Sequence, residues 1–106
     1  MSFIENHSLK SHNTFAVDCS ARLFAVFSTV DQLQRLLPNS EGPLLVLGGG
    51  SNILLTKDFP GTVLKNKITG IEVVSETKNH TIVRVGGGEV WHDFVLWSIA
   101  NNLGGI

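Results

Sequence analysis

The feature that most constrains this chain is a run of three glycines that directly follows a short apolar segment. Leu44–Leu47 are apolar, residues 48–50 are glycines, and Ser51 and Asn52 lead into further apolar residues. The apolar segment predicts a short buried strand. Consecutive glycines allow backbone angles that other residues avoid, and they let a ligand come close to the main chain. A turn of this kind directs several backbone N–H groups at one anion, most often a phosphate.

Two well-known phosphate-binding loops can be tested against this turn. Counted from Gly48, the dinucleotide-binding fingerprint and the Walker loop both require glycine at position 53, where the chain has Ile53. A second glycine triplet at residues 86–88 fails the fingerprint in the same way, because Trp91 stands where glycine is needed. The alternative that remains open is a tight turn between strands, with glycines present only for their shape.

Size and charge limit the classes of protein to which the chain can belong. A length of 106 residues allows one small domain, and the formal net charge of -1 gives no electrostatic support for binding nucleic acid or an acidic membrane. Cys19 is the single cysteine, which excludes an intramolecular disulfide and a multi-cysteine metal site. His7 and His12 lack the usual spacing of metal ligands. Without an apolar run near about 20 residues or a signal peptide, we expect a cytoplasmic protein without metal or membrane association.

The first half of the chain indicates a β-α-β unit. Residues 1–20 show no clear period and are predicted to form an extended arm, and residues 21–27 form an apolar strand candidate. Thr29 and Gln32 have capping-box spacing, and they precede an apolar stripe of helical period that ends near Pro38. The stripe consists of Val30, Leu33, Leu36 and Leu37. Two parallel strands joined by this helix would place the glycine turn at a carboxyl end, where ligands bind in open α/β sheets.

The second half predicts a short strand meander and a C-terminal helix. Residues 62–64, 68–74 and 81–85 are strand candidates, with a break at Gly70 and a polar turn at residues 78–80. The expected fold class is therefore α/β (α+β), and no internal domain boundary is predicted within residues 21–106.

The helix is predicted over residues 89–102, with Glu89 in its first turn. Val90, Phe94 and Trp97 share one face, and further apolar residues widen it. We expect the far side of this helix to pack against polypeptide that follows Ile106, or against a second copy of the chain in a self-association.

Residues 47–54 resemble the flavin-diphosphate loop of the UDP-N-acetylenolpyruvoylglucosamine reductases. Supporting segments fall in the same order along the chain, so the resemblance covers nearly all of it. These segments are residues 6–10, 13–15, 58–63, 68–72 and 85–92. The resemblance implies that residues 13–15 lie near the cofactor, whereas a side chain of this segment, such as that of Asn13, is equally suited to closing a turn.

The resemblance implies the first subdomain of a vanillyl-alcohol-oxidase-type FAD-binding fold, truncated at Ile106. It implies FAD as cofactor, NADPH as hydride donor, and UDP-N-acetylglucosamine enolpyruvate as substrate. The implied cofactor-binding residues are Leu47, Gly48, Gly49, Gly50, Ser51 and Asn52.

Catalytic residues are expected only after Ile106. The arginine, serine and glutamate of the family match nothing here, so the chain alone is not expected to catalyse the reaction. His92 and Asp93 would point about 100° apart on a helix, and we interpret His92 as a hydrogen-bonded packing residue. Two other hypotheses stay open: another flavin oxidoreductase of the same fold, and a small non-catalytic α/β binding module.

Overall fold

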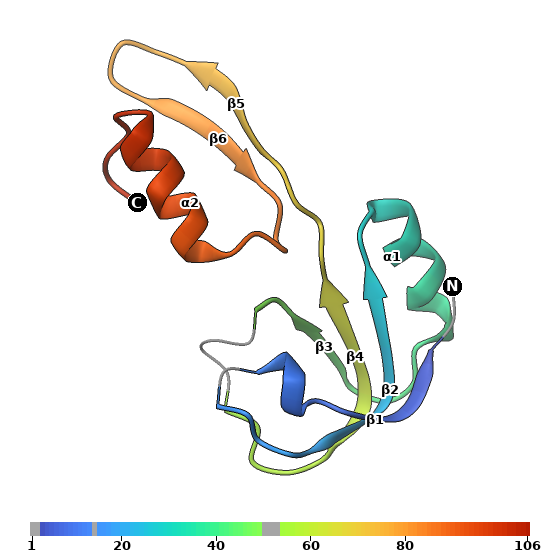
Figure 1. The fold of residues 1–106 in the computed structure, drawn as a ribbon. Helices are drawn as coiled ribbons and strands as arrows, with labels where there is room; N and C mark the ends of the chain where they lie inside the picture. The colour runs from blue at the N-terminus through green and yellow to red at the C-terminus, as the bar shows by residue number, and fades with distance from the viewer. Residues whose placement is uncertain (1–2, 14, 50–53) are drawn as a thin grey trace.

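The computed structural model describes residues 3–13, 15–49 and 54–106, which form two parts joined by one short connection, residues 67–70 (Figure 1). One part is a four-stranded sheet with helix α1 (Val30–Leu36), and the other is a β-hairpin with helix α2 (Trp91–Ala100). The molecule is elongated, with principal dimensions of 49 × 30 × 17 Å. The mixed α/β content agrees with the predicted fold class.

The larger sheet has the strand order β1-β2-β4-β3. Strands β2 (Ser20–Phe27) and β3 (Leu44–Leu47) confirm the predicted strands and run parallel to β4 (Phe59–Asn66). The prediction of a short strand within an appended meander was wrong for β4, which lies between β2 and β3. The physical reason is burial, because Thr62, Val63 and Leu64 are fully buried and can be covered on both faces only at the centre of a sheet.

Residues predicted as an extended arm are hydrogen-bonded into this sheet. Strand β1 (Ile4–Ser8) pairs antiparallel with β2, and a short 3-10 helix η1 (Lys10–His12) follows. Leu9, between the two elements, is fully buried.

Helix α1 begins at the predicted cap. The Thr29 side chain accepts a hydrogen bond from the Gln32 N–H at 3.2 Å, and Gln32 Oε1 accepts one from the Ser28 N–H at 2.7 Å. The helix passes into a 3-10 turn η2 (Leu37–Asn39) that contains Pro38. The predicted apolar stripe is only half buried, because this seven-residue helix contacts the sheet through Leu33 and Leu36 while Val30 and Leu37 stay exposed.

The sheet has a separate apolar cluster on each face. Helix α1 covers one face, where its side chains pack on Ala25, Phe27 and Leu64. The other face is covered by segments that flank the strands. Its cluster consists of Leu9, Cys19, Ala21, Phe24, Leu47, Leu55 and Val63.

The smaller part is an antiparallel hairpin of β5 (Ile71–Glu76) and β6 (Thr81–Val85). The predicted polar turn closes it, with the Thr77 N–H donating to the His80 carbonyl at 2.7 Å. Among the described residues, no helix has the length and apolarity needed to cross a membrane.

Helix α2 is shorter than the predicted 89–102. Glu89 lies before it and accepts a hydrogen bond from the Gly70 N–H at 2.7 Å. This carboxylate therefore links the connection before α2 to the connection between β4 and β5, and it takes no part in the first helical turn. Phe94 and Ser98 are buried. Val90, Trp91, Leu96 and Ile99 remain exposed.

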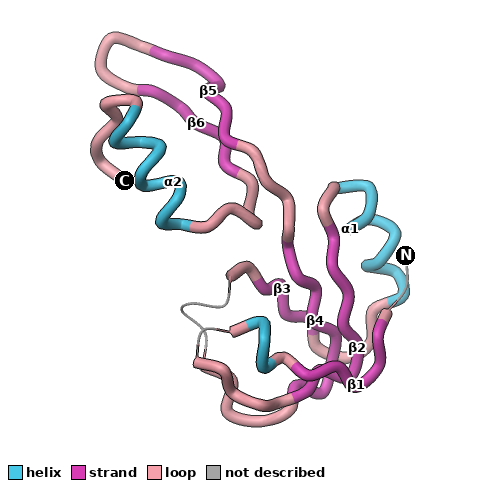
Figure 2. The backbone as a smooth tube through the Cα atoms, in the orientation of Figure 1, coloured by secondary structure: helices cyan, strands magenta, loops and turns pink. Residues whose placement is uncertain are grey.

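The second glycine triplet, in the connection from β6 to α2, lets that segment run closely beside the connection from β4 to β5 (Figure 2). The Gly86 N–H donates to the Gly70 carbonyl at 2.9 Å, and the Gly88 N–H donates to the Ile68 carbonyl at 2.7 Å. A Cβ at Gly86 would lie 2.3 Å from the Ile68 oxygen, and one at Gly88 would lie 2.6 Å from the Lys67 Cα. These glycines are therefore required by the backbone packing of the protein itself.

Candidate functional site

A groove opens at the carboxyl ends of the three parallel strands, where the first glycine turn begins. It has a volume of about 440 Å³. The end of β4, the residue after β2, the glycine turn and the second glycine triplet all contribute to its walls. Its lining residues include Ser28, Gly48, Gly49, Lys65, Lys67 and Gly88. This is the edge at which open α/β sheets bind ligands.

The predicted site residues divide into three groups. Gly48 and Gly49 line the groove. Leu47 has its side chain in the core, with 3% exposed, so its main chain is the part left for a ligand. Gly50, Ser51 and Asn52 lie outside the described residues.

The first glycine triplet differs from the second in what a side chain would meet. A Cβ at Gly48 would lie 3.6 Å from the Gly87 oxygen, an ordinary contact, and a Cβ at Gly49 would meet no atom within 4 Å. Packing of the described protein therefore does not demand glycine at Gly49. Its missing side chain leaves free space over the main chain at the mouth of the groove, and such space suits a ligand that approaches the backbone.

The groove carries positive charge. Lys65 is half-buried, and burial, followed by repulsion from Lys67, lowers the pKa of its ammonium group. Within the described ranges, Arg22–Glu41 and Arg84–Glu72 are the ion pairs, and neither includes a groove lysine. Backbone N–H groups beside cationic side chains form a site for an anion.

His7 and His12 lie next to each other, although their spacing in the sequence is not that of metal ligands. Their Nε2 atoms are 3.2 Å apart, and both rings stack on Phe24 with centroid distances of 4.5 and 4.7 Å. Burial lowers the pKa of His12 most, and Lys65, His7 and Lys67 lower it further. In the part of the chain that the structure describes, no third ligand-type residue joins them to form a metal-binding group. The contact between the two histidines could not be predicted from their spacing in the sequence, because it depends on the pairing of β1 with β2.

Asn13 closes a turn, which was one of its two predicted roles. Its Nδ2 donates to the Leu9 carbonyl at 2.7 Å, and its Oδ1 accepts from the Val17 N–H at 3.1 Å. The side chain is 7% exposed. These bonds account for its residue type without a cofactor.

The interpretation of His92 as a packing residue was wrong. His92 and Asp93 are both exposed, since the buried residues of α2 are Phe94 and Ser98. Among the described residues, no hydrogen bond from the His92 ring was found.

The fold and the groove agree with the comparison of this sequence with known families. The chain belongs to the FAD binding domain family, whose pattern matches residues 21–105. It is therefore a domain of a flavin-dinucleotide-binding class, and the predicted resemblance is confirmed at this level.

Similar curated proteins carry a more particular name. UDP-N-acetylenolpyruvoylglucosamine reductase of Bacteroides fragilis is 45% identical over 104 residues, which is 96% of this chain and 31% of that protein. The enzyme of that name from Flavobacterium johnsoniae is 41% identical over 107 residues, covering 100% of this chain and 32% of that protein. The one from Polynucleobacter asymbioticus is 43% identical over 104 residues, covering 95% and 30%. The chain thus spans about a third of the length of these relatives.

Proposed function

We propose that this chain binds the diphosphate of FAD at the first glycine turn, as part of a UDP-N-acetylenolpyruvoylglucosamine reductase. The observation that carries the proposal is the joint position of Gly48, Gly49 and Lys65 in one groove at the carboxyl ends of parallel strands. Family membership supports FAD as the ligand. The names of the similar curated proteins support the reductase.

The described residues fit a diphosphate. Gly49 has open space where a side chain would stand, and the two groove lysines supply positive charge. Each charge-assisted hydrogen bond from a backbone N–H would contribute about 1.5–3 kcal/mol, so several would offset desolvation of the phosphates. Ser51 and Asn52 are proposed to add side-chain hydrogen bonds.

Within the reductase, this chain would position the cofactor, and the catalytic groups would lie outside it. When bound, the flavin would carry a hydride from NADPH to the enolpyruvyl group of UDP-N-acetylglucosamine enolpyruvate, giving UDP-N-acetylmuramate for peptidoglycan synthesis in the cytoplasm. No residue of this chain is assigned to proton transfer, and the chain alone is proposed to be inactive. Its residues would fix the diphosphate and so hold the reactive ring in place.

A titration of the chain with FAD tests the binding site. Gly49→Val should weaken FAD binding at least about tenfold, because the new side chain fills the space over the main chain. Ser51→Ala should weaken it less. Gly104→Val is the matched control, since Gly104 also has open space around its Cβ but lies far from the groove in the chain. Equal titration curves for Gly49→Val and the unsubstituted chain would contradict the proposal.

We also propose that the chain on its own self-associates through α2. The support is an unusually apolar exposed surface, because Trp91 is 65% exposed, Leu96 51% and Ile99 66% on one ten-residue helix. In the reductase, further polypeptide would cover this surface instead. Sedimentation of the isolated chain should show association that Ile99→Glu abolishes and His92→Glu, on the same helix, does not. A monomer at high concentration would refute the proposal.

A further inference from the structure

We propose that Lys65 supplies a fixed positive charge to the diphosphate, so that the groove selects phosphorylated ligands over neutral flavins. This inference rests on the proposed function and assigns one of the site's contacts to a side chain. The glycine turn offers only partial charges from N–H groups, whereas an ammonium adds a full one. The sequence interpretation, which placed all of the diphosphate binding at the glycine turn and its polar pair, did not include this lysine.

The position of Lys65 in the sheet is what favours it for this role. It lies on the central strand β4, where it pairs with Val26 of β2 and with Leu47 of β3. Leu47 directly precedes the glycine turn, so the lysine and the turn occupy neighbouring strands at the same end of the sheet. Paired residues of neighbouring strands point to the same face, and the two apolar partners would flank the aliphatic stem of Lys65.

Lys65 lacks a counter-charge in the described part of the protein. Both ion pairs of the described ranges lie elsewhere, and the charged group that most affects Lys65 is another lysine, Lys67. Partial burial and this repulsion both disfavour the charged ammonium, which agrees with its lowered pKa. An anion bound in the groove would offset both penalties, because it would neutralise an ammonium that the described residues leave unpaired.

Lys67 is a weaker candidate for the same role. It follows the end of β4, and its side chain is exposed on the connection to the hairpin. Its N–H donates to the Phe27 carbonyl at 2.8 Å, which fixes the backbone but leaves the long side chain free in solvent. A flexible exposed lysine loses more entropy on contact than a half-buried one.

The test compares ligands with and without phosphate on three chains. Inorganic pyrophosphate, ADP, FAD and riboflavin are titrated into the unsubstituted chain, Lys65→Met and the control Lys57→Met, with binding followed through the amide signals of the glycines. Lys57 is exposed and lies just before β4 begins, at the opposite end of that strand. Lys65→Met should weaken binding of the three phosphorylated ligands at least about tenfold and leave riboflavin unchanged. Lys65→Arg should restore most of the affinity.

The outcomes separate this inference from the proposed function. If Lys65→Met binds pyrophosphate and FAD as well as the unsubstituted chain does, Lys65 has no such role, while the glycine turn can still hold FAD. If the unsubstituted chain binds no phosphorylated ligand, both proposals fail. If Lys65→Met lowers affinity for riboflavin equally, the lysine does not act through phosphate and the inference is overturned. Unchanged thermal unfolding of Lys65→Met shows that the variant is folded, and Lys65→Gln serves as the second neutral variant if methionine perturbs the fold.

Discussion

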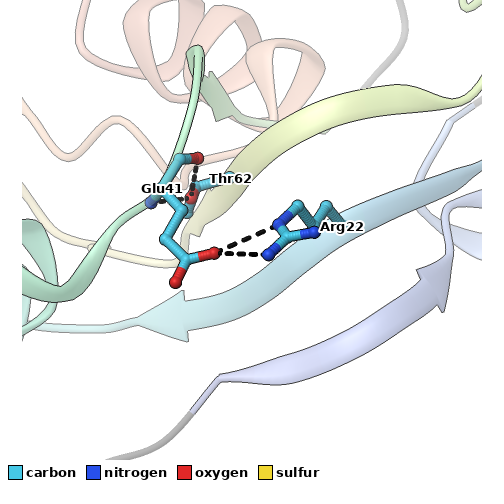
Figure 3. A network of polar contacts seen from close by, with 3 residues as sticks. All are labelled: Arg22, Glu41 and Thr62. Carbon is cyan, nitrogen blue, oxygen red and sulfur yellow. Dashed lines mark hydrogen bonds and ion pairs between the residues drawn. The ribbon is translucent and has the colours of Figure 1, made fainter.

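The Thr62 hydroxyl forms two hydrogen bonds with the main chain of Glu41, accepting from its N–H at 2.9 Å and donating to its carbonyl at 2.8 Å (Figure 3). The Glu41 carboxylate accepts from Arg22 Nε at 3.1 Å and Nη2 at 2.9 Å. Glu41, three residues before β3 begins at Leu44, is thereby joined to both β4 and β2. This arrangement holds the start of β3 in place, and the glycine turn lies at the other end of that strand.

Thr62→Val should lower the free energy of unfolding by about 2 kcal/mol, because two main-chain groups of Glu41 lose their partner. Thr62→Ser keeps the hydroxyl and should recover most of the loss. Arg22→Met should cost less than about 1 kcal/mol, since that ion pair is exposed on both sides. Urea denaturation of the three variants measures these differences, and equal stability of Thr62→Val and Thr62→Ser would contradict the assignment.

Gly61→Ala should destabilise the sheet by about 3 kcal/mol or more. A Cβ at this position would lie 2.0 Å from the Pro43 oxygen, a backbone atom that also accepts from the Thr62 N–H at 2.8 Å. Gly49→Ala is the matched control and should leave stability nearly unchanged, since its Cβ meets open space. Thermal unfolding distinguishes the two, and a stable Gly61→Ala variant would mean that β3 and β4 do not approach so closely.

Asn13→Ala should cost about 2 kcal/mol, because a buried side chain that holds both Leu9 and Val17 is removed. Asn13→Asp retains an acceptor for the Val17 N–H but no donor for the two carbonyls, so its loss should be similar or larger. Hydrogen exchange at the Val17 amide gives a local readout. A protected amide in Asn13→Ala would show that the turn closes without this side chain.

Cys19 should react slowly with a thiol reagent in the folded chain. It is 4% exposed, and burial raises the pKa of its thiol, with Asp58 and Asp18 raising it further. The reactive thiolate is therefore scarce as well as inaccessible near neutral pH. The labelling rate should rise to that of a free thiol once urea unfolds the sheet. Fast labelling without unfolding would contradict the burial of Cys19 in the cluster that it shares with Leu9 and Phe24.

Stability should fall as the pH drops below about 6.5, the ordinary pKa of histidine. The folded state lowers the pKa of His12, chiefly through burial, so the unfolded chain binds its proton first as the pH falls. The contribution of neutral His12 is complete above pH 6.5 and is lost as the pH drops toward the lowered folded pKa. His12→Gln should flatten this part of the stability profile, as measured by denaturation at several pH values. An unchanged slope would show that other groups control it.

The local elements of the fold could be predicted because their signals lie within a few residues. Thr29 and Gln32 marked the start of α1, and the apolar run before Gly48 marked β3. The position of β4 could not be predicted in this way, because a strand's neighbours in a sheet are set by pairing with distant segments. The first residues of α2 were misplaced because Glu89 forms a hydrogen bond with Gly70, a contact that helix propensity does not include.

A part of the candidate site could likewise be predicted. Gly48 and Gly49 were identified from the glycine pattern, and the structure places both in the groove. Lys65 was missed because a single lysine at the end of a strand candidate carries no motif. The reason for the second glycine triplet was also visible only in the fold, where residues 86–88 pass too close to residues 66–69 for any side chain.

By itself, the sequence determined the family, the main elements and the proposal that the first glycine turn binds an anion, because each depends on residues adjacent in the chain. Only the tertiary structure decided that β4 separates β2 from β3, that His7 meets His12, and that Lys65 lies in the same groove as Gly48. The physical reason is that strand pairing brings together residues that are far apart in the chain, and the energy of that pairing comes from burial of whole faces of the sheet.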